Sequence, residues 1–225
     1  FAHRVPHGIN QDERHAARLV VAVDPAMVGA ALDDHVAGLE RHVLVVDTHD
    51  ALLFFTDRTE LLIPPRKGRR HVLRMVRDIL AFAPRGRGTA IDMALEAIGL
   101  LLRRRSIVFL LSDFLADLES FRQPLAATNR RHDVVALDLH DPLEHSIPNV
   151  GIVALEDAET DELEWVDTGD SAWRQAFESR VADAEQQKLR LFASLGIDRV
   201  KVATDGDYVP SLNEFFARRA RRRAR

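Results

Sequence analysis

Short apolar runs alternate with longer segments of helical period along this chain. The runs RLVVAVD (18–24), DALLFFTD (50–57), SIVFLLSD (106–113), HDVVALDLHDP (132–142) and IDRVKVAT (197–204) predict buried strands. Strands this apolar, spaced by helices, are typical of a mostly parallel sheet that is covered on both faces. The pattern therefore predicts an α/β fold with a doubly wound sheet and helices on both of its faces.

The segments between these strands have apolar residues at helical spacing. Helices are predicted over 30–46, 69–82, 89–104, 117–128 and 171–195, and a further one starts near Pro210 or Ser211. Thr89 is the expected N-cap of the third helix, and Gly196 is a suitable residue to end the long one. The segment ELLIP (60–64) follows the second strand closely enough to be its hairpin partner or its continuation.

The region 150–168 has a different pattern, with two short strands expected around an acidic turn. We interpret it as a hairpin elaboration of a single domain that covers 1–225, because no linker divides the chain. Trp165 and Trp173 flank the VDTGD turn (166–170) and are expected to be packing anchors. Residues 218–225 form a basic tail, which is either a solvated helix end or a site for anionic groups.

Composition and charge narrow the possible functions. The chain has 225 residues, no cysteine and a net charge of −4. Thiolate metal sites, disulfides and a cysteine nucleophile are therefore excluded, and no overall basic field attracts nucleic acid. No apolar run approaches the ~18 residues that span a bilayer. We expect a cytoplasmic protein, with membrane association through an upstream segment or the Arg tail left as an alternative.

Oxygen-bearing side chains follow two of the predicted strands. Asp24 and Asp113 each end an apolar strand, and Thr89 follows a glycine-rich turn. Neighbouring strands would bring these three side chains to one edge of the sheet, where open α/β sheets bind ligands. Two carboxylates and a hydroxyl suit Mg²⁺. The alternative is that each aspartate caps its own turn.

A set of motifs in order along the chain resembles a known family. These are LLFFTDRTELLIPPRKGRRHVLRMVRDIL, GRGTAIDMALEAI, RRRSIVFLLSDF, RRHDVVALDLHDPLE, VGIVALEDAET with EWVDTGD, and SLNEFFARRARRR. From about residue 50 onward the chain resembles the bacterial domain of unknown function 58 family, whose core is similar to a von Willebrand factor A domain. The resemblance implies a Rossmann-like sheet. It also places the chain among uncharacterised proteins with a von Willebrand factor A-like core.

The resemblance also implies a metal-ion-dependent adhesion site, with one important departure. In such domains the first strand ends in D-x-S-x-S, and a Thr and a second Asp come from later loops. Asp24, Thr89 and Asp113 match the Asp, the Thr and the second Asp. Ala26 and Val28 stand where the two serines would be and provide no ligand oxygen. The resemblance therefore implies a degenerate site, with no cofactor or a weakly bound Mg²⁺.

The function implied by the resemblance is a non-enzymatic protein-interaction module that works with a MoxR-type AAA+ ATPase in protein assembly or maturation. No nucleic-acid partner is expected. The alternative is a metal-assisted hydrolase that uses Asp24 and Asp113 with a bound water. The expected partner-binding surface is the edge formed by Asp24, Pro25, Gly88, Thr89, Asp113 and Phe114.

Overall fold

The computed structural model describes residues 18–23, 49–86, 88–142, 146–156 and 163–223 of the chain. The predicted helix at 30–46 lies outside these residues. The strands are β1 (Arg18–Val23), β2 (His49–Phe55), β3 (Thr59–Arg66), β4 (Ile107–Ser112), β5 (Asp133–His140), β6 (Ile152–Glu156), β7 (Leu163–Asp167) and β8 (Asp198–Ala203). The helices are α3 (Arg69–Leu80), α4 (Ile91–Leu101), α5 (Leu118–Arg131), α6 (Ser171–Leu195) and α7 (Val209–Arg223).

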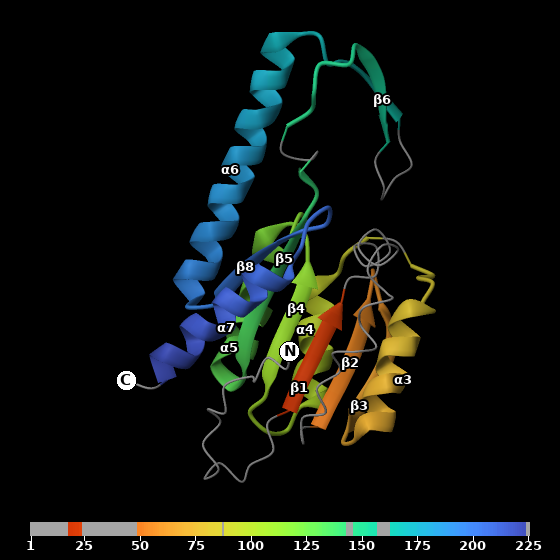
Figure 1. Ribbon diagram of the computed structural model, residues 1–225, viewed down its shortest axis with the longest axis vertical. Coiled ribbons are helices and arrows are strands. Elements are labelled where there is room, and N and C mark those ends of the chain that lie inside the picture. Colours follow the sequence, from red (N-terminus) through yellow and green to blue (C-terminus); the bar gives the residue numbers. More distant parts are fainter. Residues whose placement is uncertain (1–17, 24–48, 87, 143–145, 157–162, 224–225) are drawn as a thin grey trace, which may run out of the picture.

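Six of the strands form one sheet in the order β3-β2-β1-β4-β5-β8 (Figure 1). Neighbours within β2-β1-β4-β5-β8 are parallel, and β3 is antiparallel to β2 as its hairpin partner. The chain leaves β1 toward β2 on one side and later continues through β4 on the other. The sheet is therefore doubly wound, and its topological switch point lies between β1 and β4.

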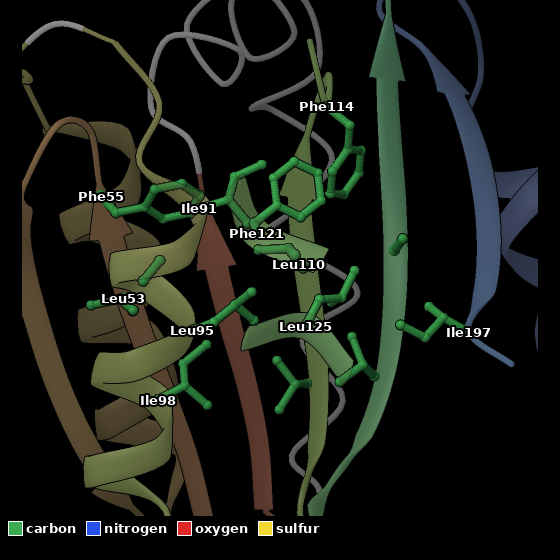
Figure 2. Close-up of a cluster of buried hydrophobic side chains, with 14 of the residues drawn as sticks. Leu53, Phe55, Ile91, Leu95, Ile98, Leu110, Phe114, Phe121, Leu125 and Ile197 are labelled. Atoms are coloured by element: carbon green, nitrogen blue, oxygen red, sulfur yellow. The ribbon is translucent and has the colours of Figure 1, made fainter. Parts of the chain in front are cut away.

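Helices cover both faces of the sheet because alternate residues of each strand are buried on opposite sides. The larger core packs residues of β2, β4 and β5 against α4, α5 and the C-terminal part of α6 (Figure 2). On the other face, Met75 of α3 packs against β2 and Phe215 of α7 packs against β5 and β8. The predicted α/β class with two covered faces is confirmed.

Local chemistry sets the ends of the helices. The Asp117 carboxylate accepts a hydrogen bond from Glu119 N at the start of α5, and Gly196 adopts a φ of 64° at the end of α6, as expected of a C-cap glycine. The prediction that Thr89 caps α4 is wrong. Ala90 holds the N-cap position, and its methyl side chain cannot accept a capping hydrogen bond.

The N-terminal half of α6 projects beyond the sheet and carries the hairpin β6–β7 near its far end (Figure 1). α6 has 25 residues, and its buried residues are Lys188, Leu191 and Phe192, all in the C-terminal half. The strands β6 and β7 pair only with each other, in a separate two-stranded antiparallel sheet. We call β6, β7 and residues 171–184 the arm. Within the described residues, no helix combines the length and the apolarity needed to cross a bilayer.

Candidate functional site

The candidate site lies at the carboxyl edge of the sheet, around the end of β1. Val23 pairs with Phe54 of β2 on one side and with Leu111 of β4 on the other. Asp24 follows directly but lies outside the described residues, as does Pro25. The two described parts of the predicted site come from the loop between α3 and α4, which is held against the end of β2, and from the loop after β4.

On the β2 side, the turn at Gly88 and Thr89 is held against the end of that strand. The backbone N–H of Ala90 donates to the carbonyl of Thr56 at 2.8 Å, and Gly88 has a φ of 79°. Left-handed backbone of this kind favours glycine, so the sequence GRGT suits the turn. Thr89 is half-buried beside the carboxyl end of β2.

A carboxylate fixes the start of this loop. Glu60 Oε1 accepts hydrogen bonds from Gly86 N at 2.5 Å and from Thr56 Oγ1 at 3.0 Å. The Gly86 N–H holds the pKa of Glu60 below its usual value, because a donated hydrogen bond favours the charged carboxylate. A Cβ atom at Gly86 would lie 2.2 Å from Thr56 Oγ1, so a side chain there would displace this hydroxyl.

On the β4 side, Asp113 sits in a tightly defined turn. Its Oδ1 accepts a hydrogen bond from Leu115 N at 3.0 Å, and Ser112 Oγ accepts one from Phe114 N at 3.2 Å. Phe114 has a φ of 53°, which is unusual for a residue with a side chain. Its ring is buried and meets Phe192 edge-on at 5.0 Å. Burial of this ring against the core holds the turn in place (Figure 2).

The two residues that follow Asp113 in this turn differ in exposure, and therefore in role. Phe114 is only 1% exposed, whereas Leu115 is 64% exposed. The expectation that Phe114 contacts a partner is therefore corrected, because its side chain faces the core. Leu115 takes that place at the surface, next to the half-buried Asp113.

A buried group of charges lies behind the Asp113 turn and was not predicted from the sequence. Lys188 of α6 donates to the Asp113 carbonyl at 3.0 Å and forms an ion pair with Asp138 at 3.4 Å. Asp138 is fully buried in β5 and also pairs with Arg199 of β8. Arg199 in turn binds both carboxylate oxygens of Glu185, at 2.7 and 2.9 Å. A network of this kind fixes α6 to the sheet edge.

The pKa of the Glu185 carboxyl lies far below its normal range. Burial alone would raise the pKa of this carboxyl, but hydrogen bonds from Arg199 and Lys201 outweigh burial and lower the pKa to about 2. Glu185 is therefore charged at all ordinary pH values. Each positive charge around Glu185 has a carboxylate partner, which reduces the free energy cost of burying these charges.

A cleft of about 380 Å³ opens between the arm and the Asp113 turn. Its apolar wall includes Leu115, Leu139, Phe177 and Val181, and Asp113 and Lys188 also line it. Within the part of the chain that the structure describes, no group of three or more His, Asp or Glu side chains lies close enough to hold a metal ion. The predicted meeting of Asp24 with Thr89 and Asp113 stays a prediction.

Sequence comparison identifies the family of this chain. The family model described as "Protein of unknown function DUF58" matches residues 42–187, more than half of the chain. The chain belongs to the DUF58 family. An uncharacterized protein of Mycobacterium tuberculosis is 32% identical to this DUF58 chain over 161 residues, which cover 71% of the chain and 50% of that protein. An uncharacterized protein of Mycobacterium avium is 30% identical, over 71% of the chain and 94% of that protein.

Solved structures share the fold of this DUF58 chain. The conserved hypothetical protein BatB from Bacteroides thetaiotaomicron has a TM-score of 0.54 at 12% identity, over 88% of this chain and 95% of that one. An aerotolerance-related membrane protein from Bacteroides fragilis has a TM-score of 0.51 at 11% identity, over 92% of this chain and all of that one. The predicted von Willebrand factor A-like fold is confirmed. The chain spans about half the length of its Mycobacterium tuberculosis relative.

Proposed function

We propose that this DUF58 chain is a non-enzymatic protein-binding module whose partner docks at the carboxyl edge of the six-stranded sheet, on the Asp113 turn. The observation that carries the proposal is the construction of this turn. A buried ring on one side and a buried lysine on the other hold it, and it presents an acidic residue beside an exposed leucine. It also lies next to the switch point between β1 and β4, where α/β sheets bind ligands.

The mixture of groups at this edge suits a protein partner. Leu115 and the apolar wall of the cleft provide contact area, and Asp113 adds one charge that selects orientation. A rigid turn loses little entropy when a partner binds, which favours affinity. The partner should therefore place an apolar side chain in the cleft and a polar or cationic group beside Asp113.

The residues fit a metal ion poorly, so the proposal does not depend on one. Of the five positions that the von Willebrand resemblance assigns to ligands, Ala26 and Val28 have no side-chain oxygen. Asp113 Oδ1 already accepts the hydrogen bond from Leu115 N. Asp24, Thr89 and Asp113 could hold at most a hydrated Mg²⁺ at this edge, because Mg²⁺ keeps several waters and needs few protein ligands.

The partner we propose is a MoxR-type AAA+ ATPase, with which the module acts in assembling or maturing other proteins. This identity comes from the family resemblance. The edge geometry supports only the binding role. The two parts of the proposal can therefore be tested separately.

Binding is tested with charge variants that keep the turn intact. Asp113→Asn retains the oxygen that accepts from Leu115 N, and Asp117→Asn is a matched control that retains the cap of α5. We expect Asp113→Asn and Leu115→Ser each to weaken binding of the ATPase about tenfold, as for other central contacts. Asp117→Asn should bind like the parent chain. Equal affinity in all four proteins would refute the docking edge.

The identity of the partner needs a separate measurement. A photo-reactive residue at position 115 should crosslink to the ATPase, and one at position 100 should not. Leu100 is 86% exposed on α4 and provides a matched apolar surface position. Crosslinking from position 115 to a different protein would keep the edge and reject the ATPase.

A further inference from the structure

One face of the β6–β7 hairpin is apolar and exposed. Residue pairing places Ala154 opposite Trp165, so Ile152, Leu163 and Trp165 share one face of the two-stranded sheet. These side chains are 70%, 61% and 72% exposed. The expectation that Trp165 is a packing anchor is therefore wrong, whereas Trp173 is half-buried and stacks on Phe177. We call this face the hairpin face.

The opposite side of the hairpin is partly covered, so the two faces differ in exposure. Val166, which alternates with Trp165 along β7, is 5% exposed. Thr168 is buried and donates to the Gly151 carbonyl at 2.6 Å, which closes the base of the hairpin. The hairpin is thus a formed element with one face lacking a described partner. Exposed tryptophan on such a face is typical of a protein interface.

The charge around the hairpin face defines what it can bind. Residues 150–170 contain eight Asp or Glu and no Lys or Arg. Such a segment repels phosphates, anionic lipid and acidic proteins, and attracts a basic segment. An occupant should therefore combine arginine or lysine with an apolar side chain.

The C-terminal helix of this chain has that composition. Residues 218–225 contain six Arg and no acidic residue. Arg219 and Arg222 pair with acidic residues of the same chain, whereas Arg218 and Arg221 are exposed and make no ion pair within the described residues. Phe216, just before them, is 49% exposed.

We propose that the hairpin face binds the C-terminal end of α7 from a second copy of this chain. The two surfaces lie far apart in one copy, with the hairpin at the end of the arm and α7 across the sheet (Figure 1). They therefore cannot meet within one molecule. Trp165 would contact Phe216 of the second copy, and the exposed Asp167, which lies opposite Ile152 on the same face, would form an ion pair with Arg218 or Arg221. Since the two surfaces differ, the contact is heterologous.

Self-association of the 225-residue chain tests the proposal. We expect sedimentation equilibrium to show reversible association at about 0.1 M salt that weakens at about 1 M, where charges are screened beyond a few ångströms. Trp165→Ser should reduce the association constant about tenfold or more. Leu100→Ser, which removes another exposed leucine on α4, should leave it unchanged. A chain that stays monomeric at both salt concentrations would overturn the proposal.

Mixing two defective variants identifies the occupant. Trp165→Ser lacks the hairpin face but keeps its arginines, and a double variant with Arg218→Glu and Arg221→Glu lacks the arginines but keeps its hairpin. Each alone should be largely monomeric, and an equimolar mixture should regain a one-to-one complex. If the mixture stays monomeric, or if the arginine variant associates normally, the C-terminal helix is not the occupant. Circular dichroism melts of all variants show whether each is folded.

Discussion

Glu185 offers a direct test of the charge network behind the Asp113 turn. Its folded-state pKa of about 2 lies below the ordinary value of 4.5. This lowering of the pKa corresponds to about 3 kcal/mol of stability at neutral pH. Because the folded pKa is lowered, this stability is present above pH 4.5 and is lost as the pH falls from 4.5 toward 2. We therefore expect Glu185→Gln to be destabilised at pH 7 by about 2 to 3 kcal/mol.

Urea unfolding of the parent chain and Glu185→Gln at several pH values measures this effect. The difference between the two free energies of unfolding should shrink as the pH falls, because the parent carboxylate becomes protonated and resembles the neutral amide. Asp183→Asn, an exposed position on the same helix, is the control and should change stability little. A difference that is the same at pH 7 and near pH 2, or no difference at pH 7, would refute the assignment.

Three further predictions use other groups. Phe114→Ala should lower the free energy of unfolding by about 3 to 5 kcal/mol in chemical denaturation, since its ring is fully buried; a loss below about 1 kcal/mol would contradict its anchoring role. Burial, followed by the charges of Arg131 and Arg105, lowers the pKa of His132, so the unfolded chain binds a proton first and stability should fall below about pH 6.5. His132→Leu should show a shallower acid slope in the same assay, and an equal slope would reject the role of His132. Titration with millimolar Mg²⁺ should leave the melting temperature unchanged; a rise that Asp113→Asn abolishes would show that the ion site is intact.

The sequence allowed most of the fold to be predicted because strand identity depends on local composition. SIVFLLSD can be little else than a buried strand, and Gly196 marks a helix end through its own backbone freedom. Thr89 was misjudged as the cap of α4 because its hydroxyl is a good cap, although the helix begins one residue later than that would require. Boundaries of this kind depend on tertiary contacts such as the one between Ala90 and Thr56.

The site could be predicted only in part, because its key contacts join distant segments. Lys188 lies in a helix rich in charged and polar residues, and nothing local distinguishes it from a solvated lysine. Its burial depends on Asp138, which is 50 residues away in the sequence. Trp165 shows the opposite case. An aromatic residue in a strand pattern is normally buried, but a two-stranded sheet has no further layer to cover both faces.

α6 joins the two surfaces that we propose bind other molecules. The hairpin lies at the N-terminal end of α6, and Lys188 in its C-terminal half donates a hydrogen bond to the main chain of the Asp113 turn. A helix is stiff along its axis, so a force on the hairpin is transmitted along α6 to the hydrogen bond between Lys188 and Asp113. A force that tilts α6 acts on the contact between the Lys188 ammonium and the Asp113 carbonyl. Binding at the hairpin and binding at the Asp113 turn would therefore be coupled through this one contact.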